Sequence, residues 1–166
     1  ESVSTIPESS IDVGAPVNNI VSGVDIVASI VQVIAGDGVN GINESGDWVT
    51  PFSQHESNHE VMFIGYQNLW RTTNLLQYAP SWSRISMNNG SGAITVVECS
   101  PADEDLFYYA TSGASLIRSD NIMETSPSYL ELHNNLPGSG AITDIEAHPW
   151  DANIVYVTRN RNVYKS

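Results

Sequence analysis

Residues 141–156 read AITDIEAHPWDANIVY, residues 93–108 read AITVVECSPADEDLFY, and residues 48–63 read WVTPFSQHESNHEVMF. Aligned without gaps, the three stretches carry apolar, polar and turn-forming residues at the same positions. After a loop of slightly variable length, each is followed by a second matching stretch: LWRT at 69–72, LIRS at 116–119 and VYKS at 163–166. The copies lie 45 to 48 residues apart. Self-similarity at this spacing is typical of solenoids, propellers and other repeat arrays.

Each copy is predicted to form short β-strands, because Val, Ile, Tyr and Thr dominate its apolar segments while proline and aspartate recur in the connections. The first strands are expected at 48–52, 94–98 and 142–146, and the second at 61–65, 106–110 and 154–158. The third strands are expected at 69–72, 116–119 and 163–166, and the fourth at 82–86 and 129–133 only. Four strands in a repeat of about 47 residues are typical of propeller blades.

The fold class is therefore predicted to be all-β, with four-stranded antiparallel blades at about 46–90, 91–138 and, in part, 139–166. Propellers close with roughly four to eight blades, so we expect an incomplete propeller within residues 36–166. Residues 1–35 are predicted to be a linker with some strand material, since Ser, Pro, Glu and Gly dominate 1–16 while Ile30–Ile34 favours a strand. Because the sequence lacks an initial Met and ends abruptly at Ser166, we expect a piece of a longer polypeptide.

The composition limits the classes of partner. Nineteen acidic residues against six basic ones give a formal net charge of −13, and 41% of the residues are hydrophobic. A field of this sign repels nucleic acid and anionic lipid, so we expect neither as a partner and no membrane insertion. The single cysteine, Cys99, excludes an intrachain disulfide and is expected to be a small buried hydrophobe. An acidic surface suits an exported protein.

Two phrases carry a resemblance to a known family. The phrase LWRTTN at 69–74 followed by Ser81-Trp82 resembles the hairpin of Asp-box (BNR) propellers, and residues 142–156 look like the strand pair of the same repeats. The phrase GDWVTPF at 46–52 is similar to a segment of large secreted Bacteroidetes proteins with sortilin-like repeats, which are substrates of type IX secretion. The resemblance implies a propeller on an extracellular or cell-surface protein. It does not fix the function, because such propellers include glycosidases, receptors and adhesins.

The chain departs from the Asp-box pattern at its central residue. Asn74 and Asn121 stand where the family has aspartate, and the glycines of the box are missing. The box is a turn that braces two strands, so this departure leaves the predicted fold intact.

The best candidates for catalytic acids are Glu98, Glu146 and Asp144, because the first strands of blades line a propeller's central channel. Glu98 and Glu146 are equivalent in the repeat, and paired carboxylates are the signature of glycoside hydrolases. The alternative is that these polar residues face solvent in the channel or pair with neighbouring backbone. A sialidase is disfavoured because Arg71 and Arg118 recur as structural positions rather than as a cluster.

Trp150 is the best candidate for a ligand contact. It lies in a turn and is expected to be exposed, whereas Trp70 and Trp82 occupy positions that behave as core between blades. His55 and His59 have the spacing of a helical zinc site, but they fall in a predicted turn and are expected to cap it. Asp37 and Asn40 could offer oxygen ligands to Ca²⁺, although a plain glycine turn fits the segment better. We therefore expect no cofactor, with Ca²⁺ as the one alternative.

The function predicted from the sequence is a non-catalytic module of an exported protein that binds a glycan or a protein. The alternative is a fragment of a propeller glycoside hydrolase of the xyloglucanase-like or sialidase-like kind. A third possibility is a structural repeat that spaces other domains. In each case the remaining blades are expected elsewhere in the parent chain or in another chain.

Overall fold

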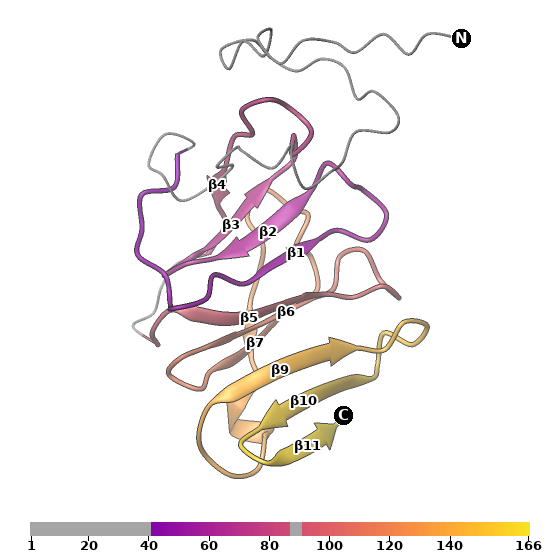
Figure 1. Ribbon diagram of the computed structural model, residues 1–166. Coiled ribbons are helices and arrows are strands. Elements are labelled where there is room, and N and C mark those ends of the chain that lie inside the picture. Colours follow the sequence, from indigo (N-terminus) through magenta and orange to yellow (C-terminus); the bar gives the residue numbers. More distant parts are fainter. Residues whose placement is uncertain (1–40, 87–90) are drawn as a thin grey trace, which may run out of the picture. The chain divides into compact units, whose positions relative to one another are not determined.

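The computed structural model describes residues 41–86 and 91–166. All of them belong to Val33–Ser166, the second of two compact units into which the chain divides. They form three antiparallel sheets of four, four and three strands (Figure 1). The predicted all-β class and the predicted number of strands in each copy are confirmed. The described residues do not form a closed propeller.

Each sheet is a meander in which strands adjacent in sequence are neighbours in space. The first sheet comprises β1 (Phe52–Gln54), β2 (Met62–Gly65), β3 (Leu69–Thr72) and β4 (Ser83–Arg84). The second comprises β5 (Ile94–Cys99), β6 (Phe107–Thr111), β7 (Leu116–Ser119) and β8 (Leu130–Glu131), and a short 3-10 helix, η3 (His133–Asn135), follows it. The third comprises β9 (Ile142–Ala147), β10 (Val155–Arg159) and β11 (Asn162–Lys165).

The pairing register repeats from sheet to sheet. Between the first two strands, equivalent positions pair in all three copies: Phe52 with Ile64, Val97 with Tyr109, and Ile145 with Val157. Between the next two strands, equivalent positions again pair: Ile64 with Trp70, Tyr109 with Ile117, and Val157 with Tyr164. The repeat seen in the sequence is therefore a repeat of strand pairing.

Two predicted elements differ from the structure. The first strand of the first copy begins at Phe52 rather than at Trp48, and Trp48 is 97% exposed. Proline has no N–H to donate, so Pro51 delays regular pairing, although its carbonyl already accepts a bond from the Gly65 N–H (2.9 Å). The fourth strands are also shorter than predicted, with two residues each in β4 and β8.

Successive sheets pack face to face through apolar residues. Val61, Phe63 and Leu69 of the first copy pack against a larger set from the second, and the rings of Phe63 and Phe107 lie 4.7 Å apart. Gly65 lets the sheets approach closely, because a Cβ atom there would lie 2.5 Å from the Ile94 side chain. Leu106, Tyr108, Ala110 and Leu116 of the second copy pack in the same way against the third. The same face of each copy thus covers the next one.

A smaller apolar cluster lies on the other face of the first sheet. Ile42 is fully buried there against Ile64, Tyr66 and Trp82, with Trp70 packed beside them. In the second and third sheets, the equivalent face is covered by the preceding sheet. In the first sheet, the segment before β1 covers part of this face. The prediction for residues 1–35 lies outside the described residues.

Candidate functional site

The turns that join the first two strands of each sheet use one repeated hydrogen bond. The Nδ1 atom of His55 accepts bonds from the N–H groups of Ser57 (3.3 Å) and Asn58 (3.2 Å). In the second and third copies, Ser100 accepts from Ala102 (3.3 Å) and His148 accepts from Trp150 (3.3 Å). The predicted capping role of His55 is confirmed, and its Nδ1 is occupied by the turn.

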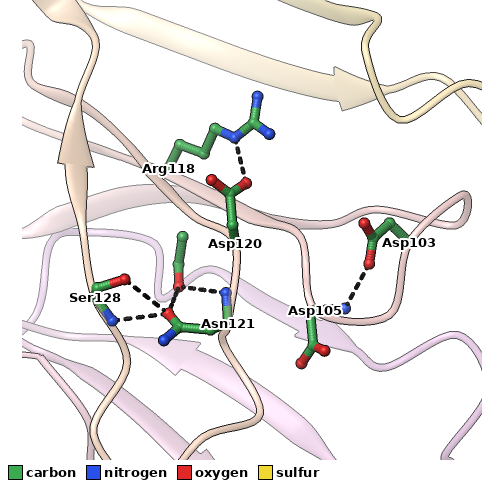
Figure 2. Close-up of polar contacts among 7 residues, drawn as sticks. Asp103, Asp105, Arg118, Asp120, Asn121 and Ser128 are labelled. Carbon is green, nitrogen blue, oxygen red and sulfur yellow. Dashed lines mark hydrogen bonds and ion pairs between the residues drawn. The ribbon is translucent and has the colours of Figure 1, made fainter.

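Asn74 and Asn121 brace the loops that follow the third strands. The Asn121 Oδ1 accepts bonds from the N–H (2.8 Å) and hydroxyl (3.0 Å) of Ser128, as Figure 2 shows. Asn74 accepts the same pair of bonds from Ser81, at 2.9 and 3.3 Å. In both loops one asparagine amide oxygen accepts two bonds from the same serine, and these residues are part of the framework.

Arg71 is also committed to the framework. Its Nη1 donates to the carbonyl oxygens of Ile122 (2.6 Å) and Glu124 (3.1 Å) in the loop between β7 and β8. Its repeat equivalent, Arg118, forms an ion pair with Asp120 at 2.6 Å (Figure 2). The contacts of Arg71 agree with the prediction of a structural arginine, whereas the ion pair of Arg118 lies within its own loop.

Glu98 is the most perturbed acid among the described residues. It lies on β5 against the third sheet, where its Oε1 accepts a bond from the Ala147 N–H (3.2 Å). Burial raises the pKa of Glu98 to about 7, and the nearby carboxylates of Glu146 and Asp144 act in the same direction, while the bond from Ala147 opposes them. The side chain therefore holds a proton near neutral pH far more readily than an exposed glutamate.

The contact made by Glu98 has a counterpart one sheet earlier. Ser53 occupies the equivalent position on β1, and its hydroxyl accepts a bond from the Cys99 N–H (3.4 Å). Cys99 and Ala147 are themselves equivalent in the repeat. Both Ser53 and Glu98 therefore tie a first strand to the next first strand, in line with the backbone-pairing alternative stated for the acids.

Glu146 and Asp144 lie on β9 and are exposed. Ser53 and Glu98 each accept a backbone hydrogen bond from the next sheet. Among the described residues, the equivalent Glu146 has no such bond to another sheet. The three predicted acids are thus close enough to interact electrostatically but differ in burial, a combination that in hydrolases separates an acid from a base.

Trp150 is 86% exposed, in the turn between β9 and β10. Its ring packs edge-on against His148, with centroids 5.9 Å apart, and this contact steadies the indole. The exposure expected for Trp150 is observed. Trp82 is buried as expected, and Trp70 is partly buried in the same apolar cluster.

A cleft between the first two sheets was not found from the sequence. It has a volume of about 760 Å³, and Arg84, Tyr109, Tyr129 and Glu131 line it. The Tyr129 hydroxyl donates to the Ile85 carbonyl (2.8 Å), which fixes that ring in the wall. One sequence signal was present, since Arg84 and Glu131 occupy equivalent repeat positions on β4 and β8 with opposite charge.

The remaining candidates concern metals. Asp37 and Asn40 lie outside the described residues. Within residues 41–86 and 91–166, no group of three or more His, Cys, Asp or Glu side chains is arranged to hold a metal ion. Cys99 is buried as predicted, and burial raises the pKa of its thiol to about 12, so the thiolate form is strongly disfavoured.

A search of protein-family models and a search of curated proteins each gave no match. No helix in the described part of the chain has the length and apolar character needed to cross a membrane.

Proposed function

We propose that this chain is a non-catalytic binding or scaffold module of an exported cell-surface or extracellular protein, built from propeller blades of the Asp-box and sortilin-like kind. The observation that carries the proposal is that the repeated polar residues hold the fold together, while one large aromatic side chain is left exposed. His55, Ser53, Arg71 and Asn121 are each committed to holding turns or sheets together. Trp150, in contrast, presents a large apolar ring to solvent.

The ligand of such a module is a glycan or a protein. A tryptophan ring offers a flat apolar face for stacking on a sugar or for burial in a protein interface, and its N–H remains free to donate. The formal charge of −13 disfavours polyanionic ligands. Further blades, from the parent chain or from another chain, are the partners expected to extend the array, and type IX secretion is the export route implied by the resemblance.

The test is binding to an array of neutral and acidic glycans, followed by titration of the best ligand against two variants. Trp150→Ala is expected to weaken binding at least about tenfold, because a central aromatic contact is worth about 2 kcal/mol. Trp48→Ala is the matched control, since Trp48 is also a highly exposed tryptophan but lies before β1, and it is expected to change affinity less than about twofold. Equal losses in both variants would contradict the assignment of Trp150, and an unresponsive array would move the search to protein ligands.

A glycoside hydrolase fragment is the second candidate, and one observation favours it. Glu98 has a pKa of about 7, which suits a general acid, and exposed carboxylates lie close to it on β9. Hydrolysis of xyloglucan oligosaccharides or sialosides that is abolished by Glu98→Gln would establish this candidate. Hydrolysis that persists in Glu98→Gln would contradict the role given to Glu98, and the absence of hydrolysis in the wild-type chain would favour the non-catalytic proposal.

A further inference from the structure

The connection between β7 and β8 locks the first and second sheets together. Ile122 is buried in the core between them, and its N–H donates to the Asp105 carbonyl (3.0 Å). Arg71 of the first sheet donates hydrogen bonds to the same connection, at the carbonyl oxygens of Ile122 and Glu124. One loop residue thus fills the interface while an arginine of the preceding sheet holds its backbone.

The strand that follows this connection completes the lock. In β8, Leu130 pairs with Arg118 of β7, and the Leu132 N–H donates to the Leu116 carbonyl (2.7 Å). Tyr129 reaches back to the first sheet, where its hydroxyl donates to the Ile85 carbonyl. The first sheet closes its own edge in the same way, because the Ile85 N–H donates to the Leu69 carbonyl (2.9 Å).

The interface between the second and third sheets offers the same groups with different partners. Arg118, equivalent to Arg71, bonds to the neighbouring Asp120 instead of to a loop of the next sheet. The Asn153 carbonyl, equivalent to that of Asp105, accepts a bond from the Ser166 hydroxyl (2.9 Å). Within the described residues, β11 pairs with β10 alone, so its other edge is open. The carbonyl of Val163, which is equivalent to that of Leu116, lies on this open edge of β11.

A cleft lies where the locking connection would fit. Its volume is about 530 Å³, and its walls include Leu116, Leu132, Val155, Tyr164 and the side chain of Arg118. Leu116 and Leu132 are equivalent to Leu69 and Ile85, which face Ile122 and Tyr129 in the neighbouring interface. The cleft is therefore the counterpart of a space that the second sheet fills with its own chain.

We propose that β11 and this cleft bind an extended polypeptide segment with the pattern of residues 122–132. Such a segment carries an aliphatic residue followed six and seven residues later by a serine and an aromatic residue, a spacing shared by Leu75, Ser81 and Trp82 in the first copy. The aliphatic side chain enters the cleft, Arg118 turns from Asp120 to the carbonyl oxygens of the segment, and the extended part pairs with the open edge of β11.

We choose a polypeptide segment as the ligand because the interface between the first and second sheets already holds such a segment at the equivalent place. The first and second sheets show which residues such a segment needs and which groups receive it. The apolar floor of the cleft suits the aliphatic side chain of such a segment, and the Arg118 guanidinium can donate to its backbone carbonyls, as Arg71 does in the neighbouring interface. Addition of a strand supplies main-chain hydrogen bonds, while the cleft gives selectivity for side chains.

The probe is a synthetic peptide of residues 119–133 carrying a fluorophore, titrated into the 166-residue chain and followed by fluorescence anisotropy. A scrambled peptide of the same composition and a peptide with alanine in place of the tyrosine are the controls. We expect saturable binding of the first peptide, and at least about tenfold weaker binding of both controls. The peptide substitutions leave the protein unchanged, so a folding defect cannot explain the difference.

Two protein variants then locate the site. Arg118→Ala is expected to weaken binding about tenfold, whereas Arg161→Ala, which removes the same charge from an exposed position outside the cleft, is expected to change it less than about twofold. Hydrogen exchange should show new protection in β11. Equal binding of native and scrambled peptides, insensitivity to Arg118→Ala, or protection that falls on β7 rather than β11 would each overturn the proposal.

Discussion

Glu98 and Ser53 occupy the same position in successive repeats, and each accepts a hydrogen bond from the backbone of the next sheet. The serine hydroxyl does this without charge, whereas the glutamate must bring a carboxyl group into a partly buried contact. Because burial favours the neutral acid, the contact costs least when Glu98 is protonated.

Glu98 therefore makes the stability of the chain depend on pH. Its pKa in the folded state, about 7, lies above the usual 4.5, so its stabilising contribution is complete below pH 4.5 and is lost as the pH rises to about 7. Solvent still reaches the side chain, so we expect a loss of about 1–2 kcal/mol rather than the full linkage value. Urea denaturation of the wild type and Glu98→Gln between pH 4.5 and 8 measures it.

The glutamine variant isolates this effect from the titration of the other carboxylates. Its amide oxygen can accept the Ala147 N–H at every pH, so the wild type should lose stability relative to it across this range and run parallel to it above about pH 8. Parallel curves from pH 4.5 upward would show that Glu98 titrates as an ordinary exposed acid.

The equivalence of Glu98 and Glu146 could be predicted from the sequence, because they occupy one repeat position. Their difference could not, since Glu98 is covered by the third sheet while Glu146 is exposed on β9. The burial of this glutamate depends on whether another sheet packs against its own sheet. The repeat pattern is the same around Glu98 and Glu146, so it does not show this difference.

At the scale of elements, the braced loops decide how each third strand connects to the fourth. Asn121 holds both the N–H and the hydroxyl of Ser128, while its own N–H bonds to the Ser119 hydroxyl (3.4 Å). An aspartate could accept the same bonds. The side-chain oxygen, rather than the charge, is therefore the feature the loop requires.

Asn121→Ala is expected to lower the free energy of unfolding by about 0.5–1.5 kcal/mol, the net contribution of hydrogen bonds at the surface, where water can replace the lost partner of the Ser128 N–H. Asn121→Asp keeps both acceptor bonds and should remain within about 0.5 kcal/mol of the wild type. Chemical denaturation compares the two variants. A loss in the aspartate variant as large as that in the alanine variant would contradict the role assigned to the oxygen.

Strand positions were predictable wherever the apolar alternation is regular, as in β5 and β9. The first strand of the first copy was wrong by several residues because Pro51 interrupts pairing in a segment that otherwise reads as strand. The cleft between the first two sheets was missed for a different reason. Its walls come from two different sheets, and the opposite charges of Arg84 and Glu131 at equivalent repeat positions are the one signal that the sequence offers for it.

At the scale of the whole molecule, the outer face of the third sheet has no other sheet of the described residues packed on it. Val163 is 69% exposed, while its equivalents Leu69 and Leu116 are 0% and 4% exposed because the next sheet covers them. The apolar pattern of β10 and β11 is thus that of a covered sheet. Uncovered faces and open edges of this kind favour association between chains.

We therefore expect the mass measured by light scattering to rise with concentration at neutral pH. Val163→Lys should reduce this rise, since it places a charge on the uncovered face without disturbing a buried contact. Arg161→Lys is the control, because it changes an exposed residue without changing the charge. A mass that stays monomeric for the wild type, or association unaffected by Val163→Lys, would contradict this expectation.

The central claim is that the same apolar face and the same bond between first strands join the first sheet to the second and the second to the third. The most direct measurement is nuclear Overhauser spectroscopy on the isotope-labelled chain. The account predicts cross-peaks between the rings of Phe63 and Phe107, 4.7 Å apart, and between the Glu98 side chain and the Ala147 amide proton, which a hydrogen bond joins in the second interface. Cross-peaks confined within each sheet, with none linking successive sheets, would contradict it.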